Sequence, residues 1–205
     1  MGQYEDEFGN HMGETMVPEL DAAFGFHLDR YKWATSMLPE KSIVLDFGCG
    51  IGYGSSVLLE KCSKYVGFDR CESRKNRFEK SYKKENTEFL VLDANQPLPF
   101  SNNYFDAVVN FENIEHVEND YLAMSEIYRV LKVGGIYVCS TPINKGQEKG
   151  HYHVREYTVE AFKKLVESQF SDVVYYGQNT YSNEFVVNAF DRIYICCVAK
   201  KTIKI

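Results

Sequence analysis

The sequence predicts an α/β protein built on a doubly wound, mostly parallel sheet of seven strands with an antiparallel pair at its C-terminal edge. Short apolar segments alternate with helical patterns between residues 42 and 140. A glycine-rich turn follows the first apolar segment, and two β-rich segments joined by a polar connection close the chain. Alternating strands and helices require right-handed crossovers, which produce a parallel sheet buried on both faces.

The 205 residues of the chain suit a single domain with a full core. We expect a flexible arm over residues 1–18, where glycines and acids are scattered, and one domain over residues 19–205. The apolar pattern from residue 19 to residue 38 fits one or two helices that end at Pro39, with Gly25 as a candidate break.

Strands and helices are expected in alternation after Pro39. Glycine tolerates the left-handed conformation that ends many helices, so we expect Gly134 and Gly135 to stop the helix that precedes them. The predicted strands cover residues 42–47, 65–68, 88–92, 105–111, 136–140, 171–176 and 192–199, and the predicted helices cover residues 53–62, 73–84, 120–131 and 158–169.

Composition and charge narrow the class of partner. The net charge of −6 disfavours a nucleic acid or an anionic membrane surface. No apolar run approaches the roughly 20 residues that span a bilayer, and residues 1–10 are too acidic and polar for a signal peptide. The six cysteines include no C-x-x-C pair, which favours reduced, buried thiols. We therefore expect a cytoplasmic protein that binds neither a membrane nor a nucleic acid. We further expect a monomer or homodimer that acts on a small molecule.

The sharpest motif is the turn after the first strand, which reads Asp46-x-Gly48-x-Gly50-x-Gly52. Glycines there permit a tight turn and let a ligand lie against bare backbone beside a helix N-terminus. The dinucleotide fingerprint G-x-G-x-x-G fails in both registers because its third glycine is missing. An acid before the loop repels a pyrophosphate but suits a ligand that carries a cationic ammonium group.

Two further acids stand at the ends of the next strands. Asp69 ends the second strand, where a carboxylate can take both hydroxyls of a ribose. Asp93 follows the third strand, where it can accept a hydrogen bond from an adenine amino group. Open α/β sheets bind ligands at the carboxyl ends of their strands, so these acids and the glycine turn predict one binding site.

These segments together resemble the class I S-adenosylmethionine-dependent methyltransferases. Residues 129–135 (Arg-Val-Leu-Lys-Val-Gly-Gly) are similar to the usual R-x-L-K-P-G-G of that family, with Val133 in place of the proline. The resemblance covers residues 25–170. It implies the Rossmann-like methyltransferase fold, S-adenosylmethionine as cofactor and S-adenosylhomocysteine as product. The segments that carry it are residues 44–54, 67–69, 92–94, 98–100 and 105–141.

The resemblance also implies how the cofactor is held. The turn of Asp46, Gly48 and Gly50 would hold its amino-acid end, Asp69 its ribose, and Asp93 with Ala94 its adenine. Phe111, at the end of the fourth strand, would flank the methionine moiety. The cofactor-binding residues implied in this sheet are Asp46, Gly48, Cys49, Gly50, Asp69, Arg70, Asp93, Ala94 and Phe111.

Residues 111–117 (Phe-Glu-Asn-Ile-Glu-His-Val) resemble the E-x-x-E-H stretch of the ubiquinone-biosynthesis O-methyltransferases. A hydroxyl acceptor needs a base, so His116 is the predicted catalytic residue. The alternative is a structural histidine that packs this loop. We expect Glu112 to contact the acceptor. Glu112, Glu115 and His116 make an incomplete ligand set, and we predict no metal site.

Two other segments complete the predicted site. Residues 26–34 resemble an H-L-x-R-Y-x-x-A stretch of methyltransferases in sugar and polysaccharide pathways. Helical spacing puts Arg30 and Tyr31 on one face with His27, so either can donate to the cofactor carboxylate; the alternative is a polar face with Tyr31 packed. The loop after the fifth strand is rich in titratable and aromatic groups. From it we expect acceptor contacts by His151, His153 and Tyr157, although histidines so spaced are often surface residues.

The predicted function is methylation of a small polar metabolite, such as a sugar or a sugar-linked intermediate. The alternatives are a quinone or phenol O-methyltransferase, which needs an apolar pocket and membrane association, and a non-catalytic cofactor-binding partner protein. Protein methylation stays open. Methylation of nucleic-acid amino groups is disfavoured by the charge and because residues 110–113 read Asn-Phe-Glu-Asn instead of Asn-Pro-Pro-Tyr.

Overall fold

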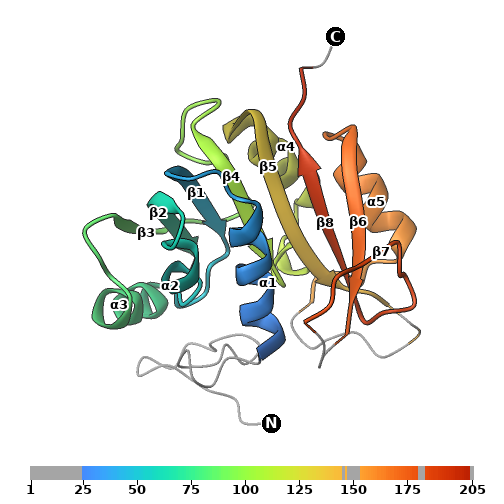
Figure 1. Ribbon diagram of the computed structural model, residues 1–205, viewed down its shortest axis with the longest axis horizontal. Coiled ribbons are helices and arrows are strands. Elements are labelled where there is room, and N and C mark those ends of the chain that lie inside the picture. Colours follow the sequence, from blue (N-terminus) through green and yellow to red (C-terminus); the bar gives the residue numbers. More distant parts are fainter. Residues whose placement is uncertain (1–24, 145, 147–152, 180–182, 204–205) are drawn as a thin grey trace.

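The computed structural model describes residues 25–144, 146, 153–179 and 183–203. The predicted arm over residues 1–18 and the predicted site residue His151 lie outside them. The described chain forms one eight-stranded sheet in the order β3-β2-β1-β4-β5-β8-β6-β7, with helices on both of its faces (Figure 1). The strands are β1 (Ser42–Phe47), β2 (Cys62–Asp69), β3 (Thr87–Val91), β4 (Phe105–Phe111), β5 (Leu131–Pro142), β6 (Asp172–Gln178), β7 (Val186–Val187) and β8 (Tyr194–Lys200).

The predicted fold class is confirmed. Strands β3, β2, β1, β4 and β5 run parallel, and β8 is antiparallel to both β5 and β6. The eighth strand, β7, was not predicted. It lies in the polar connection before β8 and pairs with β6 over two residues, too few to leave an alternating pattern in the sequence.

Alternate residues of the central strands belong to two separate cores, one on each face of the sheet. These strands are therefore nearly continuous apolar runs in the sequence. Helices α1 (Gly25–Met37), α2 (Ser55–Leu58) and α3 (Glu72–Ser81) cover one face (Figure 1). Helices α4 (Asp120–Val130) and α5 (Val159–Glu167) cover the other. In β1, Val44 packs toward α1 and α2, whereas Leu45 and Phe47 pack toward the core of α4 and α5.

The two largest errors in the predicted elements lie at the end of α2 and at the start of β5. Helix α2 ends at Leu58 instead of residue 62, because β2 already begins at Cys62. Gly134 and Gly135 do not stop a helix: α4 ends at Val130, and the next residue opens β5. The buried Leu131 pairs with Phe105, and the register between β4 and β5 then shifts. The two glycines follow this pairing and exchange backbone hydrogen bonds with Lys201, so strand pairing decides the structure here.

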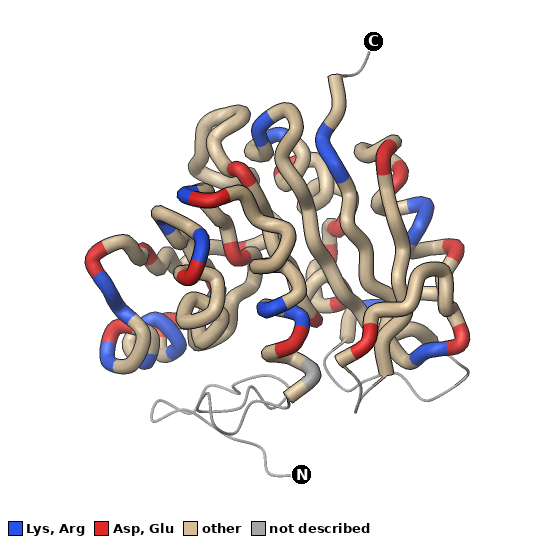
Figure 2. Tube along the Cα trace, in the orientation of Figure 1, with Lys and Arg blue, Asp and Glu red and all other residues tan. Residues whose placement is uncertain are grey.

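Charges are interspersed along the chain. Figure 2 shows basic and acidic positions alternating over the helices and loops without a long run of one sign. Most ion pairs between described residues link groups at or near the surface, whereas the pairs Arg30–Glu112 and Arg74–Asp69 are largely buried. Among the described residues, no helix is both long and apolar enough to cross a membrane.

Candidate functional site

The carboxyl ends of β1, β2 and β4 meet at one edge of the sheet, and the glycine turn follows β1 there. Gly48, Gly50 and Gly52 have φ angles of 74°, 58° and 77°, in the left-handed region that favours glycine. A Cβ atom on Gly48 would lie 2.2 Å from Cγ of Asn113. Because Asn113 follows β4, this contact packs the turn after β1 directly against the loop after β4.

Asp46 lies buried beneath the turn. Its carboxyl accepts hydrogen bonds from the hydroxyls of Tyr31 (3.2 Å) and Tyr65 (2.9 Å). Burial raises the pKa of Asp46 to about 7, although the two tyrosine hydrogen bonds act in the opposite direction, and the charge of Asp69 adds to the rise. A cationic group placed at the turn would lower this pKa again and stabilise the carboxylate.

Tyr31 takes the packed arrangement that was the alternative for α1. Its ring meets the rings of Phe111 and Tyr53 edge-on, with centroids 5.0 and 5.5 Å apart. A Cβ atom on Gly54 would lie 2.1 Å from Cε1 of Tyr31, so the turn needs a glycine beneath this ring. Tyr31 therefore orders the turn and Asp46.

Asp69 joins the end of β2 to the glycine turn. Its Oδ2 accepts hydrogen bonds from the amide of Gly50 (3.2 Å) and from Nη1 of Arg74 (2.7 Å), and its Oδ1 accepts one from the amide of Cys71 (3.1 Å). Sequence reasoning missed Arg74, because nothing in its spacing separates it from the other cations of α3. The predicted neighbour Arg70 is exposed, and Cys49 directs its side chain into the core of α1 and α2.

The loop after β3 places Asp93 and Ala94, the residues predicted to hold adenine, at the same edge, because the last pair of the β2–β3 ladder joins Asp69 to Val91. Asp93 is exposed, and its Oδ1 accepts hydrogen bonds from the backbone amide (2.9 Å) and the side chain (3.0 Å) of Asn95. Ala94 is half-buried. The carboxyl of Asp93 is thus already oriented by a local turn.

Glu112 begins the loop after β4 in a strained conformation, with φ at 51°. Its carboxyl accepts a hydrogen bond from Oγ of Ser140 (2.7 Å), and its Oε1 lies 3.1 Å from Nη1 of Arg30. The Arg30 side chain is fully buried; its Nε donates to Gln178 (2.7 Å), and its guanidinium covers the ring of Tyr194. Arg30 therefore ties α1 to the loop after β4 and to the strands β6 and β8.

Glu115 and His116 lie in a short 3₁₀ helix, Ile114–His116, which Asn113 separates from Glu112. Glu115 is buried and accepts a hydrogen bond from Oγ1 of Thr141 (3.0 Å). Burial, together with the nearby charge of Glu112, raises the pKa of Glu115 well above its ordinary value. The backbone carbonyl of Glu115 also accepts hydrogen bonds from the amides of Val154 (2.9 Å) and Arg155 (3.3 Å).

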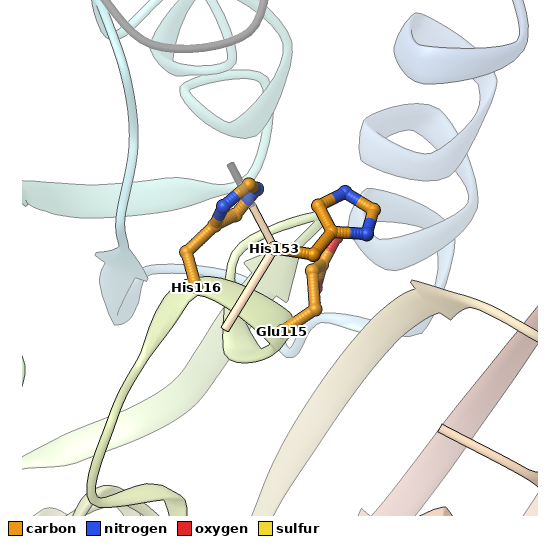
Figure 3. A group of neighbouring side chains, drawn as sticks. All are labelled: Glu115, His116 and His153. Atoms are coloured by element: carbon orange, nitrogen blue, oxygen red, sulfur yellow. The ribbon is translucent and has the colours of Figure 1, made fainter. Parts of the chain in front are cut away.

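These backbone bonds bring the loop after β5 to the loop after β4. The ring of His153 meets the ring of His116 edge-on, with centroids 4.9 Å apart (Figure 3). Nδ1 of His153 lies 2.7 Å from Oε1 of Glu156. Tyr157 is buried and donates to Asp120 on α4 (2.7 Å), so it anchors this segment instead of lining open space.

Comparisons with known proteins point to one family. A methyltransferase domain model matches residues 45–139. A probable S-adenosylmethionine-dependent methyltransferase of Mycolicibacterium smegmatis is 31% identical over 165 residues, which make up 76% of this chain and 63% of that protein. The ubiquinone biosynthesis O-methyltransferase of Dinoroseobacter shibae is 31% identical over 107 residues, which make up 48% of this chain and 40% of that protein.

The solved structure of an S-adenosylmethionine-dependent methyltransferase of Thermotoga maritima has the same fold. It superposes with a TM-score of 0.73 at 19% sequence identity, over 94% of this chain and 99% of that chain. The chain spans less than two thirds of the length of the first curated relatives it matches.

Proposed function

Because the chain belongs to the class I S-adenosylmethionine-dependent methyltransferases, we propose that it transfers a methyl group from this cofactor to a hydroxyl of a small polar metabolite. A sugar or a sugar-linked intermediate fits this class. The observation that carries the proposal is the meeting of the glycine turn, Asp46 and Asp69 at one edge of the sheet.

The turn suits the amino-acid end of the cofactor. Its glycines offer backbone that a ligand can approach closely, and the buried carboxyl of Asp46 favours a cation nearby. Asp69 would hold the ribose hydroxyls, because Arg74 and two backbone amides already fix its carboxylate. Asp93 and Ala94 would flank the adenine, and Phe111 the methionine moiety.

Bound S-adenosylmethionine supplies an electrophilic methyl group on a sulfonium. Transfer of this methyl group to an acceptor oxygen would break the carbon–sulfur bond, leave neutral S-adenosylhomocysteine and require a base of the chain to take the hydroxyl proton. Displacement of this kind depends strongly on placing the acceptor in line with the breaking bond. We assign activation of the hydroxyl to His116, which follows Phe111 by five residues, and positioning of the acceptor to Glu112 and His153.

A quinone or phenol acceptor is the second candidate. It is favoured by the E-x-x-E-H stretch of residues 112–116 and by the similarity to a ubiquinone biosynthesis O-methyltransferase. The described loops near His116 instead carry carboxylates, histidines and an arginine, and side chains of this kind favour a polar acceptor.

Two measurements test the proposal. Calorimetry with S-adenosylhomocysteine should show binding that Asp69→Ala weakens. A screen with methyl-labelled cofactor against sugars, sugar nucleotides, hydroxy acids and phenols should then label a polar acceptor. Binding without any labelled product would support the non-catalytic alternative, and labelling of phenols alone would support the quinone or phenol reading.

A further inference from the structure

Three potential metal ligands converge where the loops after β4 and β5 meet. One ligand atom each from Glu115, His116 and His153 lies within 4.8 Å of the other two. Figure 3 shows the two imidazole rings projecting to the same side of the 3₁₀ helix, with the Glu115 side chain beneath His153. The sequence places His153 thirty-seven residues beyond His116, which is why the E-x-x-E-H stretch alone looked incomplete.

We infer that Glu115, His116 and His153 form a binding site for a divalent transition-metal ion such as Zn²⁺. Imidazole nitrogens and a carboxylate oxygen are the ligands that such ions take in proteins. Three protein ligands leave at least one coordination position for a small molecule, as in catalytic rather than structural zinc sites.

The size of the site fits an ion after a small adjustment. Ligand atoms about 2.0–2.1 Å from a tetrahedral zinc ion lie roughly 3.4 Å from one another. Separations of up to 4.8 Å need the side chains to close by an ångström or so. Rotations of the two histidine rings can supply this, because His116 and His153 are both partly exposed.

Neighbouring side chains orient Glu115 and His153 through hydrogen bonds, as is usual for the ligands of a metal site. A ligating histidine commonly bonds its second ring nitrogen to a carboxylate, which fixes the ring and raises its basicity. Glu156 provides this carboxylate for His153, with Nδ1 and Oε1 2.7 Å apart. Thr141 orients the carboxyl of Glu115 (3.0 Å). The amide bonds from Val154 and Arg155 to the Glu115 carbonyl hold the two loops together.

A charge argument points the same way. Glu115 is buried, and Glu112 is nearby in the same loop. Burying a carboxylate is costly unless a cation or hydrogen bonds compensate it. Arg30 forms its ion pair with Glu112 and acts more weakly on Glu115, whose carboxyl is bonded to a neutral hydroxyl and to a backbone amide. A divalent ion would offset this second carboxylate.

The site would also refine the acceptor class, a step that rests on the proposed function. An ion here would bind an acceptor oxygen and lower the pKa of its hydroxyl, so His116 would act as a ligand rather than as a free base. An acceptor with two adjacent oxygens, such as a vicinal diol or a hydroxy acid, could occupy two coordination positions.

The direct test is metal binding by the purified chain after treatment with a chelator. Titration with Zn²⁺ in a calorimeter should show one site, and Co²⁺ should give visible absorption bands typical of nitrogen and oxygen ligands. His116→Ala and His153→Ala should each weaken Zn²⁺ binding by at least tenfold. Glu156→Gln should weaken it as well, since loss of such outer partners typically costs about 10–100-fold.

His27→Asn is the matched control, because this histidine lies on α1 and outside the cluster. It should leave Zn²⁺ affinity unchanged. The inference fails if the wild-type chain binds no Zn²⁺, or if His153→Ala binds it as tightly as the wild type. Affinity for S-adenosylhomocysteine is measured on the same samples. If it is intact in every variant while Zn²⁺ binding never appears, only the metal site is refuted and the proposed function stands.

Discussion

Two regions at the same edge of the sheet are assembled in different ways. The first loop region, residues 46–54 with 69–74, is held largely by its own backbone turns and by contacts between the consecutive strands β1 and β2, with Tyr31 of α1 packed over it. The second loop region, residues 111–116 with 153–157, is held by partners from β5, α1 and the strands beyond it. Local motifs therefore reveal the first region, whereas the second exists only once distant segments have packed.

The two regions also differ in electrostatics. In the first, the buried Asp46 bonds to two tyrosine hydroxyls, and Asp69 pairs with Arg74. In the second, two carboxylates and two histidines gather near one buried arginine. The first region suits a ligand that carries a cationic group, and the second suits a group that must lose a proton. Each prediction below alters one region and measures whether the other responds.

The largest effect is expected in the second loop region. His116→Ala should lower kcat by about 10²–10⁴-fold, the usual range when the general base that takes the acceptor's proton is removed. Affinity for S-adenosylhomocysteine should hardly change, because His116 has no part in the first region. Steady-state kinetics on the acceptor found by the screen gives kcat.

His153→Ala separates two roles for His116. If His116 acts alone as a base, His153→Ala should raise KM more than it lowers kcat. If the two rings share a metal ion, both variants should lower kcat to a similar extent. A His116→Ala variant with wild-type kcat would leave only the structural role.

A smaller loss is expected from the first loop region. Asp69→Ala should weaken S-adenosylhomocysteine binding by roughly 10–100-fold, because charge-assisted hydrogen bonds contribute about 1.5–3 kcal/mol. Calorimetry measures the affinity. Asp106→Ala is the matched control: like Asp69, Asp106 pairs with a cation (Lys132) and a backbone amide, but it lies at the opposite ends of the strands. Equal effects of the two substitutions would mean that general destabilisation, and not ribose binding, causes the loss.

Much of this architecture follows from the sequence, and the exceptions have physical causes. Strands β1 and β4 match their predicted bounds, because apolar runs bounded by polar turns leave a clear pattern. The glycine stop after α4 was mispredicted, because burial of Leu131 against β4 outweighs a local glycine preference. Arg74 lies only five residues from Asp69, but its spacing does not separate it from the other cations of α3. Tyr65 and Thr141 escaped notice because their partners, Asp46 and Glu115, lie 19 and 26 residues away in the chain. Their importance becomes visible only in three dimensions.

The contact between the two regions can be tested through Gly48. In Gly48→Ala the new Cβ atom would clash with Asn113, and alanine would have to adopt the left-handed backbone conformation of Gly48. The substitution should therefore destabilise the fold by about 1–3 kcal/mol. Gly134→Ala is the matched control, since Gly134 also has a positive φ but open space around it. Urea unfolding should show the larger loss for Gly48→Ala. Equal losses would mean that Asn113 yields freely and that the two regions are not tightly packed together.

The last two predictions concern the ionisation of Asp46, first in its effect on stability and then in its smaller effect on cofactor binding. The pKa of Asp46 is raised to about 7, above its ordinary value of 3.8. Its carboxyl therefore stays protonated in the folded chain while it is ionised in the unfolded chain between these two values. Stability that this proton provides is present below about pH 4 and is lost as the pH rises to about 7. The melting temperature of the wild type should fall over this range, and Asp46→Asn should show a smaller fall.

Ligand binding should respond to the same proton in the opposite direction. A cationic ammonium group favours the ionised carboxyl, which is a minor species at pH 6 and the major species at pH 8 when the pKa is about 7. If only the ionised form binds tightly, affinity for S-adenosylhomocysteine should rise by up to about tenfold between these pH values. Asp46→Asn should remove this rise, because an amide does not titrate. Tyr65→Phe removes a hydrogen bond that lowers the pKa of Asp46, so it should move the rise to higher pH. A wild-type affinity that is flat from pH 6 to pH 8 would place the ammonium group away from Asp46, and the first loop region would then bind its ligand through backbone contacts alone.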